Sequence, residues 1–212
     1  DVLKLIKYLE TQCYKLGVNV RLNTAATSEN IKGGHYDKVV LAAGASPVIL
    51  NLKGIENTTL VTDYLTHKAT VGKKVLVIGG GLAGTEAACD IAPNADEVTI
   101  IEMLPDILFS AAHCLNNDQH LKDMVKARGV KVEANAKVTE ITDHSVTFER
   151  DGQSFTLECD TVLNAVGFRA NNQLEDLLEE TYEDVSVIGD AVAPRKILTA
   201  VHEGYHAIRV ME

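Results

Sequence analysis

The sequence predicts an α/β fold built on a parallel sheet, and three observations carry this expectation. Short apolar runs alternate with helical patterns along the chain. One apolar run, residues 73–78, passes directly into a glycine-rich turn and then into a helical pattern. A second apolar run, residues 98–101, follows that helix and ends at Glu102. A strand, a helix and a second strand in this order are typical of a βαβ unit.

The turn after the first of these strands carries glycines at the spacing G-x-G-x-x-G. Gly79 permits a tight turn, Gly81 leaves room for a pyrophosphate against the backbone, and Gly84 lets the helix pack close to the strand. Unpaired N–H groups and the helix dipole also favour a phosphate at this helix start. With both strands in place the pattern predicts a dinucleotide-binding site. A glycine-rich turn without a ligand is the alternative.

Glu102 ends the second strand and predicts which dinucleotide is bound. A carboxylate there can accept hydrogen bonds from the adenosine ribose hydroxyls, and it would repel a 2′-phosphate. Met103 and Leu104 follow it and supply no arginine that could pair with such a phosphate. The sequence therefore favours NAD(H) over NADP(H).

Length and composition narrow the class of protein. The 212 residues allow one or two domains, and a hydrophobic share of 46% is typical of a globular chain. A net charge of −10 argues against nucleic acid and anionic membranes as partners. No apolar run approaches the roughly 20 residues of a membrane span, and the chain does not open on a leader pattern. We therefore expect a cytoplasmic protein.

The cysteines are scattered and form no C-x-x-C pair. This spacing argues against a redox dithiol, a zinc knuckle or an iron–sulfur ligand set within this chain. We expect reduced, mostly structural thiols at the four positions, which are Cys13, Cys89, Cys114 and Cys159.

The remaining helices and strands are predicted from hydrophobic periodicity and from glycines at turns and helix ends. Asp151-Gly152 is a strong hairpin signal, and Gly17 and Gly129 are typical helix ends. Because the chain opens directly into a helical pattern without an initiator methionine, we expect a piece of a longer polypeptide. Helices are expected at 1–16, 63–67, 113–128, 174–179 and 196–210, and strands at 18–22, 38–43, 130–133, 138–141, 145–150, 155–158, 160–166 and 185–188.

Four segments together resemble two-dinucleotide flavoprotein reductases. Residues 42–47 (AAGASP) resemble the A-T-G-x-x-P segment of these enzymes, and residues 79–84 look like their NAD(P)H loop. Residues 162–171 resemble the strand that ends in G-x-x-P-N, and residues 187–190 look like the late G-D motif. Within that superfamily, residues 190–197 and 200–204 look most like NADH:flavin oxidoreductases of the 2,4-dienoyl-CoA reductase and trimethylamine dehydrogenase type.

This resemblance implies a composite enzyme. Such proteins carry an N-terminal barrel with FMN, a four-iron (4Fe-4S) cluster, and an FAD domain interrupted by an NAD(P)H domain. The barrel, the cluster cysteines and a first glycine loop for FAD do not occur in this sequence. We therefore expect part of an FAD-binding domain at 1–70, a complete Rossmann-like NAD(H)-binding domain at 71–167, and a return to the FAD domain at 168–212. The expected partners are a nicotinamide nucleotide and the protein's own missing barrel.

The resemblance also implies roles for individual residues. Gly189 and Asp190 match the motif that contacts the flavin ribityl chain, and Lys196-Ile197 match the start of a helix that points at the isoalloxazine. Ala43 and Gly44 match a segment near the flavin. The sequence departs from the family with Ala where Thr is common in residues 42–44, and with Ala170 where Pro is common. Together with the NAD(H) site, the expected cofactor-binding residues are Ala43, Gly44, Gly79, Gly81, Leu82, Ala83, Gly84, Glu86, Glu102, Met103, Gly167, Gly189, Asp190, Lys196 and Ile197.

Glu86 matches the acid in the first turn of the NAD helix, near the expected nicotinamide. Hydride transfer between nicotinamide and flavin needs no protein acid or base, so no catalytic residue is expected.

Two other functions compete with this interpretation. Residues 202–206 (HEGYH) match H-E-x-x-H, which on a helix would bind zinc with Glu203 as the base. Gly204 inside that helix costs about 1 kcal/mol and suggests close packing instead, so we expect no metal site. The second alternative is an adenine-nucleotide-binding scaffold without redox turnover.

Overall fold

A computed structural model describes residues 2–109 and 115–209. The chain forms two compact units: residues 1–40 with 173–186, and residues 41–172 with 187–212. The second unit contains a five-stranded parallel sheet, and its helices alternate with its strands. The predicted α/β class with a Rossmann-like parallel sheet is confirmed.

The first unit is built from short elements. It holds helices α1 (Val2–Lys15), α2 (Ser28–Lys32) and α6 (Glu175–Thr181). Strands β1 (Val39–Leu41) and β12 (Val185–Val187) begin in it, where the Val39 amide donates to the Asp184 carbonyl at 2.9 Å. The Tyr182 hydroxyl donates to the Gly34 carbonyl at 3.1 Å and ties α6 to the turn after α2.

The strand predicted at residues 18–22 is wrong, because this segment is irregular after α1. Alternation of Val18, Val20 and Leu22 suggested a strand, but all three side chains are exposed. A strand is stabilised by pairing with a neighbour, and no described residue pairs with this segment.

The parallel sheet of the second unit has the order β3-β10-β4-β5-β6. Its register places Val77 beside both Ile100 and Leu163, so the centre of the sheet is formed by large apolar residues. The strands are β3 (Thr59–Leu60), β4 (Lys74–Ile78), β5 (Glu97–Ile101), β6 (Lys131–Glu133) and β10 (Thr161–Asn164).

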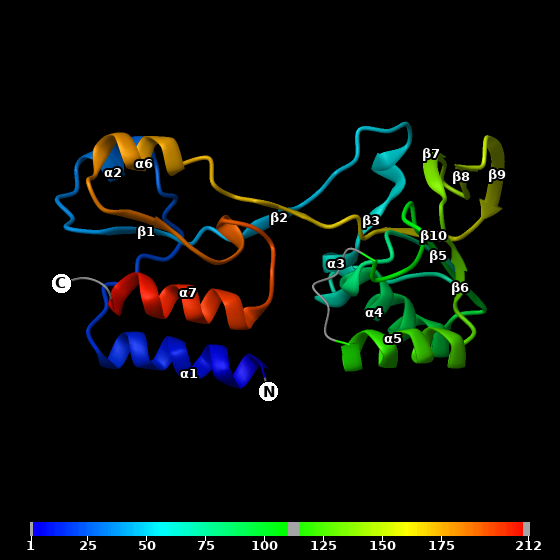
Figure 1. The fold of residues 1–212 in the computed structure, drawn as a ribbon, viewed down its shortest axis with the longest axis horizontal. Helices are drawn as coiled ribbons and strands as arrows, with labels where there is room; N and C mark the ends of the chain where they lie inside the picture. The colour runs from blue at the N-terminus through cyan, green and yellow to red at the C-terminus, as the bar shows by residue number, and fades with distance from the viewer. Residues whose placement is uncertain (1, 110–114, 210–212) are drawn as a thin grey trace. The chain divides into compact units, whose positions relative to one another are not determined.

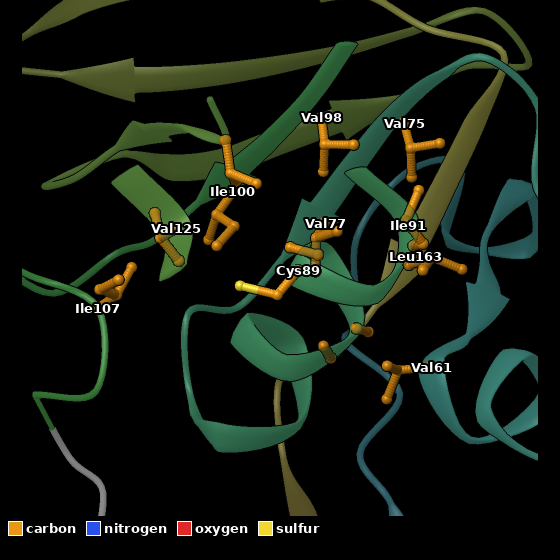
Figure 2. Packing of buried hydrophobic residues seen from close by; sticks show 14 of the residues in the cluster. Val61, Val75, Val77, Cys89, Ile91, Val98, Ile100, Ile107, Val125 and Leu163 are labelled. Carbon is orange, nitrogen blue, oxygen red and sulfur yellow. The ribbon is translucent and has the colours of Figure 1, made fainter. Parts of the chain in front are cut away.

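Both faces of this sheet are covered, which explains why its strands read as continuous apolar runs. Helices α3 (Val61–Leu65), α4 (Leu82–Ile91) and α5 (Leu115–Ala127) lie on one side (Figure 1). There Val75 and Val77 pack in a cluster with Cys89 of α4, and Figure 2 shows these side chains together. Leu76 and Ile78 belong to a second cluster on the other face.

The second cluster is completed by an antiparallel sheet. Strands β7 (Lys137–Ile141), β8 (Ser145–Arg150) and β9 (Gln153–Glu158) form it, and Phe148 of β8 is 1% exposed. The β8–β9 turn has Asp151 at φ 53° and Gly152 at φ 74°, as the hairpin signal predicts.

The other elements are short. Strand β2 (Ala45–Pro47) pairs antiparallel with β11 (Phe168–Ala170). Single 3-10 turns lie at η1 (Ile55–Asn57), η2 (Ala92–Asn94) and η3 (Gly189–Ala191), and helix α7 (Ile197–Arg209) closes the described chain. Among the helices that the structure describes, none has the length and apolar character to cross a membrane.

Candidate dinucleotide-binding site

The glycine turn lies where the chain order of the parallel sheet reverses. From β4 the chain continues to β5 and β6 on one side, whereas β10 lies on the other side. Ligands of open α/β sheets bind at the carboxyl ends of the strands at such a reversal. The turn after β4 and residues 165–167 after β10 meet at this edge. There the Ala165 amide donates to the Ile78 carbonyl at 2.8 Å.

Each glycine of the motif has a different reason to be glycine. Gly79 has φ 103°, and a Cβ there would lie 2.5 Å from the Ala165 carbonyl oxygen. A Cβ on Gly84 would lie 2.0 Å from the Gly79 carbonyl oxygen, so α4 crosses the strand end at close range. A Cβ on Gly81 would meet no protein atom within 4 Å. The turn thus packs tightly at its two ends and is open in the middle.

Gly81 is also the residue that caps α4. It has φ −71° and ψ −172°, and no side chain caps the helix start. The amides of Leu82, Ala83 and Gly84 fall in the first turn, where a helix has no internal acceptors for its N–H groups. Glu86 follows one turn later and is exposed. This open, capless helix start has the chemistry of an anion site.

Glu102 lies at the end of β5 and is 9% exposed. One carboxylate oxygen accepts the Gly80 amide at 2.5 Å, and the other accepts the Leu104 amide at 2.7 Å. A carboxylate has about four acceptor positions, so two bonds leave capacity for ribose hydroxyls. The bond to Gly80 is not predictable from the sequence, because nothing in the spacing of these residues indicates that the acid contacts the turn. Met103, beside it, is 63% exposed.

Two segments that carry the family resemblance are brought together. The Asn171 amide donates to the Gly44 carbonyl at 2.9 Å, and its side-chain amide donates to the Ala43 carbonyl at 3.2 Å. The Ser46 hydroxyl lies 2.9 Å from the Asn171 side-chain oxygen. Gly167 has φ 105°, where the chain turns from β10 into β11. Residues 43–47 and 167–171 therefore form one hydrogen-bonded ribbon.

The G-D turn is held by an acid from the next helix and by a base in the loop before that helix. Glu203 of α7 accepts the Gly189 amide at 2.7 Å, and its other oxygen pairs with the Arg195 guanidinium at 2.7 Å. Asp190 accepts the Arg195 amide at 2.9 Å. Lys196 and Ile197, at the start of α7, are exposed.

These contacts give the H-E-x-x-H segment a structural explanation. Both carboxylate oxygens of Glu203 are engaged with the G-D turn and Arg195, so the carboxylate is not available as the base of a zinc site. Gly204 is not forced by close packing, because an added Cβ would lie 3.7 Å from the nearest atom, on Ile188. The described residues include no group of three or more potential metal ligands.

Replacing Glu203 tests this structural role. We expect Glu203→Ala to lower the free energy of unfolding by about 1 kcal/mol, because the Gly189 amide loses its acceptor. Glu203→Gln, which keeps one oxygen acceptor, should lose less. Urea unfolding measures both values, and elemental analysis of the wild-type chain is the companion test. Stoichiometric zinc in the wild-type chain would contradict this assignment.

The described cysteines have structural surroundings. Cys89 and Cys159 are buried, and burial raises the pKa of both thiols, that of Cys159 to about 11. A thiol with a raised pKa is protonated at neutral pH and is a poor nucleophile. Cys13 is half-buried and not in a disulfide, and Cys114 lies outside the described residues.

Most of the chain is similar to known proteins. The model of the pyridine nucleotide-disulphide oxidoreductase family matches residues 4–204. The chain belongs to this family. The fold agrees, since the structure of a 2-naphthoyl-CoA reductase in complex with 2-naphthoyl-CoA matches 99% of the chain with a TM-score of 0.83 at 31% identity.

Curated members of the family are similar over nearly the whole chain. Cinnamate reductase of Clostridium sporogenes is 32% identical over 206 residues, which cover 97% of this chain and 31% of the relative. NADH oxidase of Thermoanaerobacter brockii is 35% identical over 206 residues, which cover 93% of this chain and 31% of the relative. The match to 2-naphthoyl-CoA reductase covers 32% of that chain. The family member described here thus spans about a third of the length of these relatives.

Proposed function

We propose that the chain is the electron-input part of an NADH-dependent flavin oxidoreductase and binds NADH for hydride transfer to FAD. The observation that carries this proposal is the glycine turn itself, in which Gly81 is open and Gly80 binds a buried acid, Glu102, at the end of the next strand. The similarity to an NADH oxidase and a cinnamate reductase supports it. Residues 190–197 and 200–204 favour the 2,4-dienoyl-CoA reductase and trimethylamine dehydrogenase branch.

The residues at the glycine turn fit a dinucleotide. The space beside Gly81, which a Cβ would enter without meeting protein, would take the pyrophosphate, and the amides of Leu82 and Ala83 would donate to it. Glu102 would accept bonds from the adenosine ribose, with Met103 beside the adenosine. Gly167 and Glu86 would border the nicotinamide half. The nucleotide supplies the hydride, and these residues bind and orient it.

The flavin side of the proposal rests on the matched motifs. Gly189 and Asp190 would face the ribityl chain, and Lys196 and Ile197 would start the helix directed at the isoalloxazine. Ala43 and Gly44 would lie near the same ring. In this proposal residues 1–70 and 168–212 belong to an FAD-binding domain, and residues 71–167 form the NAD(H)-binding domain inserted in it. FMN, a four-iron cluster and the barrel that holds them would belong to a further part of the protein.

An adenine-nucleotide-binding scaffold is the second candidate. The observation that favours it is that the sequence holds one G-x-G-x-x-G turn, whereas a two-dinucleotide enzyme uses two. Calorimetric titration with NADH and with ADP separates the two functions. We expect NADH to bind more tightly than ADP, because the nicotinamide half adds contacts. Equal affinities, with no flavin in the purified protein, would favour the scaffold.

Glu102 sets the nucleotide preference in this proposal. We expect Glu102→Ala to reduce the preference for NADH over NADPH by about tenfold. This corresponds to the loss of one charged interaction worth about 1.4 kcal/mol. Parallel titrations of both nucleotides on wild type and variant measure the ratio of dissociation constants. An unchanged ratio would remove Glu102 from the ribose site.

A further inference from the structure

Gly80, which the G-x-G-x-x-G spacing leaves unspecified, is fixed by residues 102–108. Its amide donates to Glu102 at 2.5 Å, and its carbonyl accepts the Leu108 amide at 2.7 Å. A Cβ on Gly80 would lie 2.8 Å from the Ile107 Cγ2 methyl and 3.1 Å from a Glu102 carboxylate oxygen. Gly80 is not among the residues with positive φ. Contact with this loop, and not backbone conformation, therefore requires glycine here.

The loop that makes these contacts is itself anchored. Ile107 and Leu108 are each 3% exposed, and both belong to the cluster that includes Val125 of α5; Figure 2 shows Ile107 and Val125 at one end of it. Asp106 accepts the Ile107 amide at 2.8 Å and pairs with Lys122 of α5 at 2.5 Å. The loop thus connects the glycine turn to the helix layer.

Leu108 has an unusual backbone conformation. Its φ is 61°, in the left-handed region that leucine rarely adopts. Such strain persists where surrounding contacts impose it, and it is concentrated at functional sites. Here the strained residue is the one whose amide binds the Gly80 carbonyl. The conformation therefore serves the contact between the loop and the turn.

We propose that residues 102–108 form a clasp that holds the glycine turn in its phosphate-binding shape before the nucleotide arrives. Ile107 and Leu108 are positioning residues of the clasp. The inference rests on the proposed function, because it concerns the same NADH site. A turn that is already ordered loses less conformational freedom on binding, so the clasp contributes to NADH affinity.

The test is a double-mutant cycle on the ligand-free and NADH-bound chain. Gly80→Ala places a methyl against Ile107 and should separate the turn from the clasp. We expect faster hydrogen exchange at the Gly80 and Leu108 amides and an NADH affinity about tenfold weaker. Ile107→Ala removes the methyl that would collide, so Gly80→Ala with Ile107→Ala should regain affinity relative to Gly80→Ala alone. This non-additivity marks a direct contact.

Asp106→Ala is a second variant. It removes the ion pair with Lys122 of α5 at an exposed position and leaves the buried side chains unchanged. We expect NADH affinity to fall roughly threefold, in the range of one hydrogen bond. An NADH affinity that is unchanged in both Gly80→Ala and Asp106→Ala would overturn the clasp. So would a double variant, Gly80→Ala with Ile107→Ala, whose loss of NADH binding free energy equals the sum of the losses in the two single variants.

The clasp can be tested separately from NADH binding. If the wild-type chain does not bind NADH, the exchange measurements still test the clasp. In that case slow exchange at the wild-type Gly80 amide, lost in Gly80→Ala, supports the clasp. A wild-type Gly80 amide that exchanges as fast as an exposed one contradicts it.

Discussion

Gly81→Ala is expected to weaken NADH binding by about a hundredfold, near 2.8 kcal/mol, while the fold is retained. The added Cβ meets no protein atom within 4 Å, and Gly81 has φ −71°, which alanine adopts without strain. The methyl would instead occupy the space proposed for the pyrophosphate. Titration of NADH into wild type and variant measures the loss.

The control for Gly81→Ala is a measurement of the stability of the variant by urea unfolding. Since the methyl projects into open space, the free energy of unfolding without nucleotide should equal that of wild type. NADH affinity close to the wild-type value would mean that no phosphate approaches Gly81, and the proposed site would be wrong.

Gly84→Ala is expected to have a large effect on the stability of the fold. Its Cβ would lie 2.0 Å from the Gly79 carbonyl oxygen and 3.1 Å from the Ala165 Cβ. Backbone at that distance cannot move aside as a flexible side chain can, so α4 must shift away from the end of β4. We expect a loss of about 3 kcal/mol in the free energy of unfolding, as for other overpacked cores. Urea unfolding of the nucleotide-free chain measures it.

Gly204→Ala is the matched control for this substitution. It also replaces a helical glycine, but its Cβ would meet only Ile188 at an ordinary 3.7 Å. Alanine is favoured over glycine inside a helix by about 1 kcal/mol, so this variant should not be destabilised. If Gly84→Ala and Gly204→Ala lost the same free energy of unfolding, close packing at Gly84 would not be the cause of the destabilisation.

The elements with local sequence signals could be predicted. The run at residues 73–78 and the hairpin at Asp151-Gly152 each indicate their structure within a few residues. The same holds for the glycines, whose spacing predicted a turn at the end of β4. Strands β2, β3 and β11 were missed, because segments of two or three residues become strands only through distant partners.

The candidate site was predictable in its chemistry but not in its internal contacts. The acid at the end of β5 was expected to face a ribose, but nothing in the sequence indicated that it also accepts the Gly80 amide. The contacts of Ile107 and Leu108 with Gly80 were equally hidden, since they link residues far apart in the chain. Glu203 was weighed as a metal-site base, and only the positions of Gly189 and Arg195 reveal its partner. Long-range packing decides such contacts, and no spacing rule encodes them.

The central claim is that the glycine turn after β4 binds NADH. Amide chemical-shift mapping of the chain during an NADH titration tests it most directly. We predict saturable shifts concentrated at residues 79–84 and 102–103 and at Gly167, with the amides of Leu82 and Ala83 among the largest. Shifts absent from this turn, or confined to other parts of the chain, would contradict the claim.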